Sequence, residues 1–181
     1  MPDLFAPVLS ALISSSVFAF LLSVVFLRRS KQIEAEIKLR MDRLAATATS
    51  QRQWKERAIA DLLGPVYMQL DRTRRAFDRW TTQNLFLEAK VIREGNLAIR
   101  DLLLQKGHLI PPELLEDAGK LVEHYDRWLE EYEKQRLAER PDLDAPFTFV
   151  GPQGFPFPQE ADRRFRAAFK SLWVELYGVA A

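Results

Sequence analysis

The chain of 181 residues has no cysteine, which excludes disulfides, thiolate metal sites and a cysteine nucleophile. It has only two histidines, His108 and His124. Neither stands in the Glu-x-x-His pattern of a bundle metal site, so we interpret both as surface or hydrogen-bonded side chains. Glycine-rich phosphate loops, nucleophile elbows and HExxH strings are also missing. We therefore expect no catalytic residue, no cofactor and no metal.

Charged side chains are missing from residues 4–27, and Arg28, Arg29 and Lys31 follow at once. A helix of this length extends about 36 Å, enough to cross a hydrocarbon core of about 30 Å. A cleaved signal peptide would carry bases before the apolar run and small residues after it. A buried soluble helix rarely has so long a charge-free run. Residues 1–29 are therefore predicted to form a single-pass transmembrane anchor.

Positive charge is concentrated directly after this predicted span. Residues 28–57 contain nine bases and four acids, whereas residues 58–181 contain 17 bases and 20 acids. Bases beside a span favour the cytoplasmic side and attract anionic headgroups, so Arg28, Arg29 and Lys31 are candidate membrane-surface residues. The pattern predicts a bacterial inner-membrane protein with its N-terminus outside and its C-terminal domain in the cytoplasm.

Two spacings indicate contact faces on the N-terminal helix. Ser15, Ala19 and Ser23 recur every four residues, which suits self-association of a span, although such residues are also tolerated in a lone span. Residues 30–63 are predicted as a basic juxtamembrane helix that loosens or bends at the small residues 45–50. Its apolar stripe favours a packing face over a long coiled coil. The stripe consists of Ile33, Ile37, Met41 and Leu44.

Residues 64–181 are predicted to form an antiparallel helical bundle, so the fold class is all-α. Gly64 and Pro65 predict a kink or a helix restart. Residues 81–84 either form a break or lie within one long helix. A further break is expected at residues 107–112, where Gly107 would cap the preceding helix.

The clearest helical pattern follows and ends by Pro141, with Arg136 on or past its outer edge, and a last helix begins near Gln159. The buried face of the clearest helix is predicted to comprise Leu114, Ala118, Leu121, Val122, Tyr125, Trp128, Leu129 and Tyr132.

Residues 141–158 form a loop rich in proline and phenylalanine before the last helix. A turn is predicted at residues 151–154, and a small hairpin is an option nearby. Four exposed phenylalanines are unfavourable in water, so they either fold back onto the bundle or bind a partner. These candidate partner-binding residues are Phe147, Phe149, Phe155 and Phe157.

A second candidate surface combines basic and aromatic side chains. Arg72, Arg75 and Arg79, with Arg74 among them, lie close to Phe77 and Trp80. A nucleic-acid interface uses such residues, but Asp71 and Asp78 dilute the charge, and Phe77 and Trp80 fit the core stripe of Val66 and Leu70 better. We therefore favour a charged helix face that contacts a protein or the membrane over a nucleic-acid interface.

These patterns predict a membrane-anchored, non-enzymatic interaction or scaffold protein. It would present its cytoplasmic bundle to an unknown cytoplasmic protein or to itself as a homo-oligomer. The alternative is a membrane effector, whose span oligomerises and perturbs the bilayer when the cytoplasmic domain senses a cue.

Overall fold

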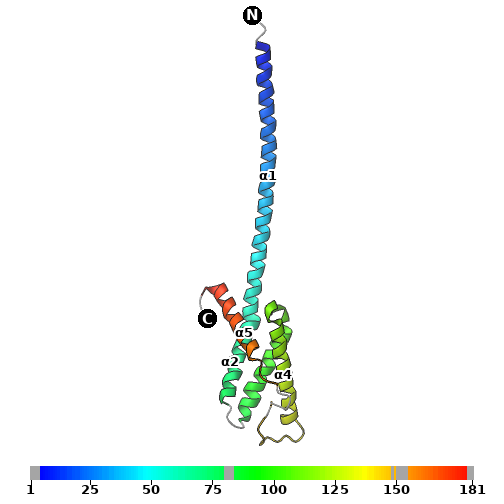
Figure 1. Cartoon of the computed structure of the whole chain (residues 1–181), viewed down its shortest axis with the longest axis vertical. Helices are drawn as coiled ribbons and strands as arrows, with labels where there is room; N and C mark the ends of the chain where they lie inside the picture. The colour runs from blue at the N-terminus through cyan, green and yellow to red at the C-terminus, as the bar shows by residue number, and fades with distance from the viewer. Residues whose placement is uncertain (1–4, 80–83, 148, 150–154, 179–181) are drawn as a thin grey trace. The chain divides into compact units, whose positions relative to one another are not determined.

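The computed structural model of the chain describes the backbone of residues 5–79, 84–147, 149 and 155–178, and within these ranges the side chains of Phe20 and of Ser23 onward. The chain divides into two units, residues 1–50 and 51–181. Every regular element in the described ranges is helical, which confirms the predicted all-α class (Figure 1).

The described residues of the first unit, 5–50, belong to a single helix, α1 (Phe5–Ala58), which continues into the second unit. The predicted loosening at residues 45–50 is wrong, because the helix is unbroken there. Two threonines in this stretch bond back to the preceding turn: Thr47 Oγ1 donates to the Arg43 carbonyl at 3.0 Å and Thr49 Oγ1 to the Ala45 carbonyl at 2.8 Å. These bonds satisfy the hydroxyls inside the helix.

The predicted membrane span falls mostly on residues whose side chains lie outside the described part of the chain. The backbone of residues 5–27 is helical. Within the part that the structure describes, no helix combines the length and the apolar character that crossing a bilayer requires.

The predicted irregularity at Gly64 and Pro65 is a π-helical turn, Ile59–Leu63, between α1 and α2 (Gly64–Arg79). The Gly64 amide donates to the Ile59 carbonyl five residues back. This wider turn precedes Pro65, which has no amide hydrogen for a regular helical bond. A Cβ at position 64 would lie 2.8 Å from the Ile59 oxygen, so the turn requires glycine.

A second π-helical segment, Leu87–Arg93, leads into α3 (Glu94–Gln105). The Asn84 side-chain oxygen accepts from the amide of Leu87, the first residue of this segment, at 3.0 Å. Residues 80–83, which include most of the alternative break at residues 81–84, lie outside the described residues.

Two 3₁₀ turns, Gly107–Leu109 and Pro112–Leu114, then join α3 to α4 (Leu115–Arg136), and α5 spans Gln159–Tyr177. The predicted glycine cap at Gly107 is wrong. Among the described glycines, only Gly178, after α5, has a positive φ, at 68°. Lys106 closes α3 instead, and its amide donates to the Leu102 carbonyl at 2.9 Å.

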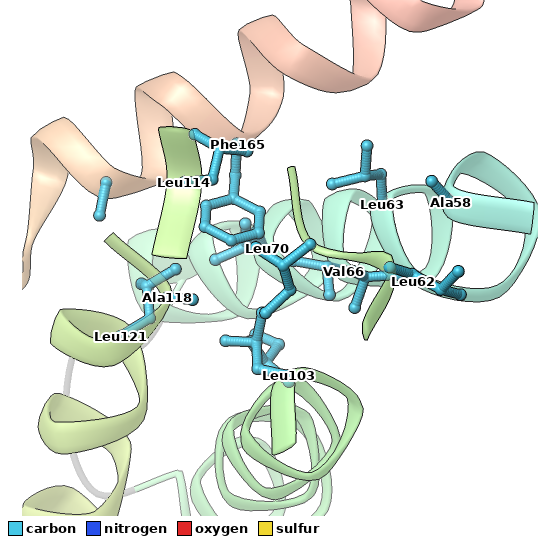
Figure 2. Packing of buried hydrophobic residues seen from close by; sticks show 14 of the residues in the cluster. Ala58, Leu62, Leu63, Val66, Leu70, Leu103, Leu114, Ala118, Leu121 and Phe165 are labelled. Carbon is cyan, nitrogen blue, oxygen red and sulfur yellow. The ribbon is translucent and has the colours of Figure 1, made fainter. Parts of the chain in front are cut away.

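The helices of the second unit form a closed bundle, in which α2 packs on α3, α3 on α4, α4 on α5, and α5 on α2. Their common core confirms the predicted helical bundle and the predicted inner face of α4. Figure 2 shows Phe165 pointing from α5 toward Leu70 and Leu114. The side chains in this core that are almost fully buried include Leu62, Leu63, Val66, Ile99, Leu121 and Tyr125.

A second buried cluster joins the end of α2, the Leu87–Arg93 segment, the later half of α4 and the loop after α4. The Trp128 and Tyr132 rings stack with centroids 5.3 Å apart, and Phe147 packs edge-on against Trp128 at 5.1 Å. Such aromatic pairs add about 0.5–1.5 kcal/mol beyond the buried area. The buried members are Ala76, Leu87, Ile92, Trp128, Leu129, Tyr132 and Phe147.

Gly95 sets the close approach of α3 to α2, and this contact gives a test of the packing. A Cβ at position 95 would lie 2.2 Å from Cγ2 of Thr73. We expect Gly95→Ala to lower the free energy of unfolding by about 1–2 kcal/mol, because overpacking outweighs the better helix propensity of alanine. Urea unfolding of the full chain in detergent, followed by circular dichroism, measures the effect.

The matched background is Thr73→Ser, which removes Cγ2 and retains the hydroxyl that donates to the Gln69 carbonyl at 2.9 Å. In that background we expect Gly95→Ala to stabilise the bundle by up to about 1 kcal/mol, the helix-propensity difference. An equal loss in both backgrounds would show that the two residues do not limit the approach of the helices.

Candidate interaction site

An open groove of about 430 Å³ lies between α2 and the Leu87–Arg93 segment. Its floor is apolar, because Ala76 and Leu87 belong to the second buried cluster and Val91 packs on that cluster. We call it the arginine groove. Its lining residues are Met68, Gln69, Asp71, Arg72, Arg75, Ala76, Arg79, Leu87 and Val91.

The structure brings the three predicted arginines together along this groove. Arg72 is held across it, since Nη2 donates to the Lys90 carbonyl at 3.1 Å and Nη1 to the Gln69 side chain at 3.4 Å. Arg75 Nε donates to Asp71 Oδ2 at 2.7 Å on the exposed side of α2. With Arg79, the lining carries three guanidinium groups against one carboxylate. The groove therefore has a positive rim over an apolar floor.

Phe77 does not belong to the core stripe, contrary to the prediction. Its side chain is 63% exposed, whereas Val66, Leu70 and Ala76 are buried. Near the end of α2 the buried position is Ala76, which belongs to the second buried cluster together with Leu87 and Ile92 of the following segment. Trp80 lies outside the described residues.

The four phenylalanines of the loop have different surroundings. Phe147 is buried in the second cluster and Phe149 is partly buried beside it. Phe155 lies under the Arg127 guanidinium, whose Cζ is 3.7 Å from the ring centroid. Phe157 packs edge-on against His124 at 5.3 Å and remains partly exposed. Phe147 is therefore a core residue, and the predicted turn at residues 151–154 lies outside the described residues.

A buried ion pair, Glu88 with Arg136, was missed by the sequence reasoning, which placed Arg136 at the outer edge of its helix. The side chains are only 2% and 3% exposed. Arg136 Nε and Nη2 donate to the two Glu88 carboxylate oxygens at 2.5 and 3.2 Å, and Nη1 donates to the Asp142 carbonyl at 2.8 Å. The hydrogen bond with Glu88 raises the pKa of Arg136. The pair joins the Leu87–Arg93 segment to the end of α4 and the start of the loop.

His124 was interpreted as a surface or hydrogen-bonded side chain, and the structure corrects this. Its ring contacts Tyr125, Phe149 and Phe157 edge-on, with centroids 5.2–5.4 Å apart. Its Nδ1 is buried without a hydrogen-bond partner among the described residues. Burial lowers the pKa of His124 to about 4, so the imidazole is neutral at pH 7.

No group of three or more His, Asp or Glu side chains within the described residues is arranged to hold a metal ion. The lining of the arginine groove contains guanidinium groups, one carboxylate, one amide and apolar side chains. Its chemistry suits recognition of a carboxylate-bearing ligand with apolar groups.

The predicted membrane-surface residues Arg28, Arg29 and Lys31 lie on α1 in the first unit, and their side chains are exposed. Comparison with known proteins gives no further guidance: no family model, curated protein or solved structure matches the chain.

Proposed function

We propose that the protein is a membrane-anchored, non-enzymatic scaffold whose bundle binds an acidic, partly apolar segment of a cytoplasmic protein in the arginine groove. The observation that carries this proposal is the composition of the groove, with Arg72, Arg75 and Arg79 above a floor that includes Leu87 and Val91. Arginine forks pair with carboxylates, and apolar side chains of the same segment would cover the floor.

The anchor in this proposal is the charge-free run of residues 4–27, and Arg28, Arg29 and Lys31 contact anionic headgroups. The protein would lie in a bacterial inner membrane with the bundle in the cytoplasm. Phe155 and Phe157, which lie against side chains of α4, are a second candidate contact surface. The scaffold would therefore recruit its partner to the membrane surface.

Charge reversal in the groove tests the proposal. We expect the double variant Arg72→Glu, Arg75→Glu to reduce capture of the acidic partner at least about tenfold, because like charges replace attraction across a contact worth more than about 1.4 kcal/mol. Capture is measured by chemical cross-linking of the full chain in membranes, followed by quantitative mass spectrometry that maps the cross-linked segments.

The control is Arg74→Glu, which reverses one charge on the same helix outside the groove lining. Capture should persist in this control. The proposal fails if both variants capture equally, if the cross-linked segments are not acidic, or if the bound material is nucleic acid or phospholipid.

The second candidate function is a membrane effector that perturbs the bilayer through its oligomerised span. The recurrence of Ser15, Ala19 and Ser23 favours it. A potential-sensitive dye separates the two functions, since induction of an effector depolarises cells whereas induction of a scaffold leaves the potential unchanged.

A further inference from the structure

The exposed part of α1 carries a continuous uncharged face, which we call the α1 stripe. Its residues are spaced by four, three, four, four, three and four positions. Eleven residues make three turns of an α-helix, so this spacing holds every member on one face. The members are Phe26, Ser30, Ile33, Ile37, Met41, Leu44 and Ala48.

No charged residue lies on this face, although charged residues dominate the rest of the segment. From Arg28 to Arg43, nine of 16 residues are charged, at positions 28, 29, 31, 34, 36, 38, 40, 42 and 43, and none belongs to the stripe. The five large apolar side chains of the stripe are 51% to 69% exposed. No described part of the chain therefore covers the stripe, and an amphipathic helix normally buries such a face against another surface.

The same face continues into the predicted membrane span. Helix α1 is unbroken, and counting back along it places positions 15, 19 and 23 at the angular position of the stripe. These are the small residues Ser15, Ala19 and Ser23, whose spacing suits close helix contact in a bilayer. The occupant must therefore be a helix that runs beside α1 both in the membrane and in water, and a second copy of α1 meets this requirement.

We propose that α1 pairs with α1 of a second copy of the chain, parallel and in register, through the α1 stripe. The proposal rests on the proposed membrane anchor, which orients both copies alike and raises their effective concentration. Edge charges agree with a parallel pair: Arg29 and Glu34 flank opposite sides of the stripe, so Arg29 of one copy comes near Glu34 of the other. The 11-residue spacing gives a nearly straight or slightly right-handed pair.

The absence of cysteine makes the contact directly measurable, because a single introduced cysteine cannot form a disulfide within its own chain and a dimer-sized product reports contact between copies. The stripe variants are Ile33→Cys, Ile37→Cys and Leu44→Cys. The matched controls are Ala35→Cys, Leu39→Cys and Ala46→Cys, which lie on the opposite side of the same helix. Each full-length variant is oxidised in native membranes at low expression, and the dimer fraction is read on a non-reducing gel.

We expect roughly five-fold or more dimer at the stripe positions than at the controls, since a disulfide needs Cβ atoms about 3.5–4.5 Å apart. Like residues can meet at all three stripe positions only in a parallel, in-register pair. Dimer at one position alone, equal dimer at all six, or none at the stripe overturns the pairing. The last result would mean that lipid, another protein or another part of the chain covers the stripe.

Alkaline carbonate extraction of the same membranes tests the anchor separately. Release of the chain into the supernatant would refute the proposed membrane anchor, whichever disulfides form. A chain that stays in the membrane without stripe disulfides overturns the pairing and leaves the scaffold proposal intact.

Discussion

Glu88→Ala is expected to lower the free energy of unfolding by about 3–5 kcal/mol, the usual cost of leaving a buried charge without its partner. Arg136 would keep its positive charge inside the second cluster, where its side chain is 3% exposed. Of its hydrogen bonds to described residues, the one from Nη1 to the Asp142 carbonyl, at 2.8 Å, would remain. Thermal and urea unfolding of the full chain in detergent measure the loss.

An exposed pair on the same bundle is the matched control. Glu123 accepts from Arg127 at 2.6 Å with both side chains open to solvent, so Glu123→Ala should cost less than about 1 kcal/mol. The double variant Glu88→Met, Arg136→Met should recover most of the stability, because it removes both charges and refills the space. A loss for Glu88→Ala no larger than that for Glu123→Ala would refute a structural role of the pair.

The stability of the bundle is expected to fall by about 2 kcal/mol through His124 as the pH decreases from about 6.5 to about 4. Burial lowers the pKa of His124 from its ordinary value of 6.5 to about 4, so the unfolded chain takes up the proton first. Stability from the neutral ring is therefore complete above pH 6.5 and is lost as the pH falls through the folded pKa. Partial exposure of the ring keeps the effect below the full value that this shift allows.

His124→Phe is the variant that isolates this contribution, since a phenyl ring can replace the imidazole among Tyr125, Phe149 and Phe157. Carboxylates also titrate in this range, so the informative quantity is the difference between the two stability curves. That difference should grow steadily in favour of the variant as the pH falls. Parallel curves from pH 7 to pH 4 would contradict the assignment.

Much of the bundle could be predicted because its signals are local. The inner face of α4 follows from helical spacing alone, and Leu114, Leu121 and Tyr125 are buried as predicted. The start of α5 at Gln159 also agrees, and Pro158 stands directly before it at the N-cap position. The irregularity at Pro65 follows from the missing amide hydrogen, whereas its π-helical form is given only by the structure.

The candidate site was predicted only in part, because its other half comes from distant residues. Arg72, Arg75 and Arg79 recur along one helix and could be named from spacing. Leu87 and Val91 complete the groove from a second segment, and no local pattern pairs that segment with α2. Phe77 was misplaced for the same reason: near the end of α2 the buried position is Ala76, which belongs to one cluster with Leu87 and Ile92 of the second segment.

The sequence by itself determined the helical class, the order of helices, the charge-free N-terminal run and the basic segment after it, because composition and periodicity depend on near neighbours. Tertiary structure alone decided that Glu88 and Arg136 meet inside the core, that His124 is enclosed by aromatic rings, and that the arginines border an apolar groove. Each of these three features depends on side chains brought together from separate elements. Burial sets the charge state and the energy of these side chains, and it exists only after the helices have packed.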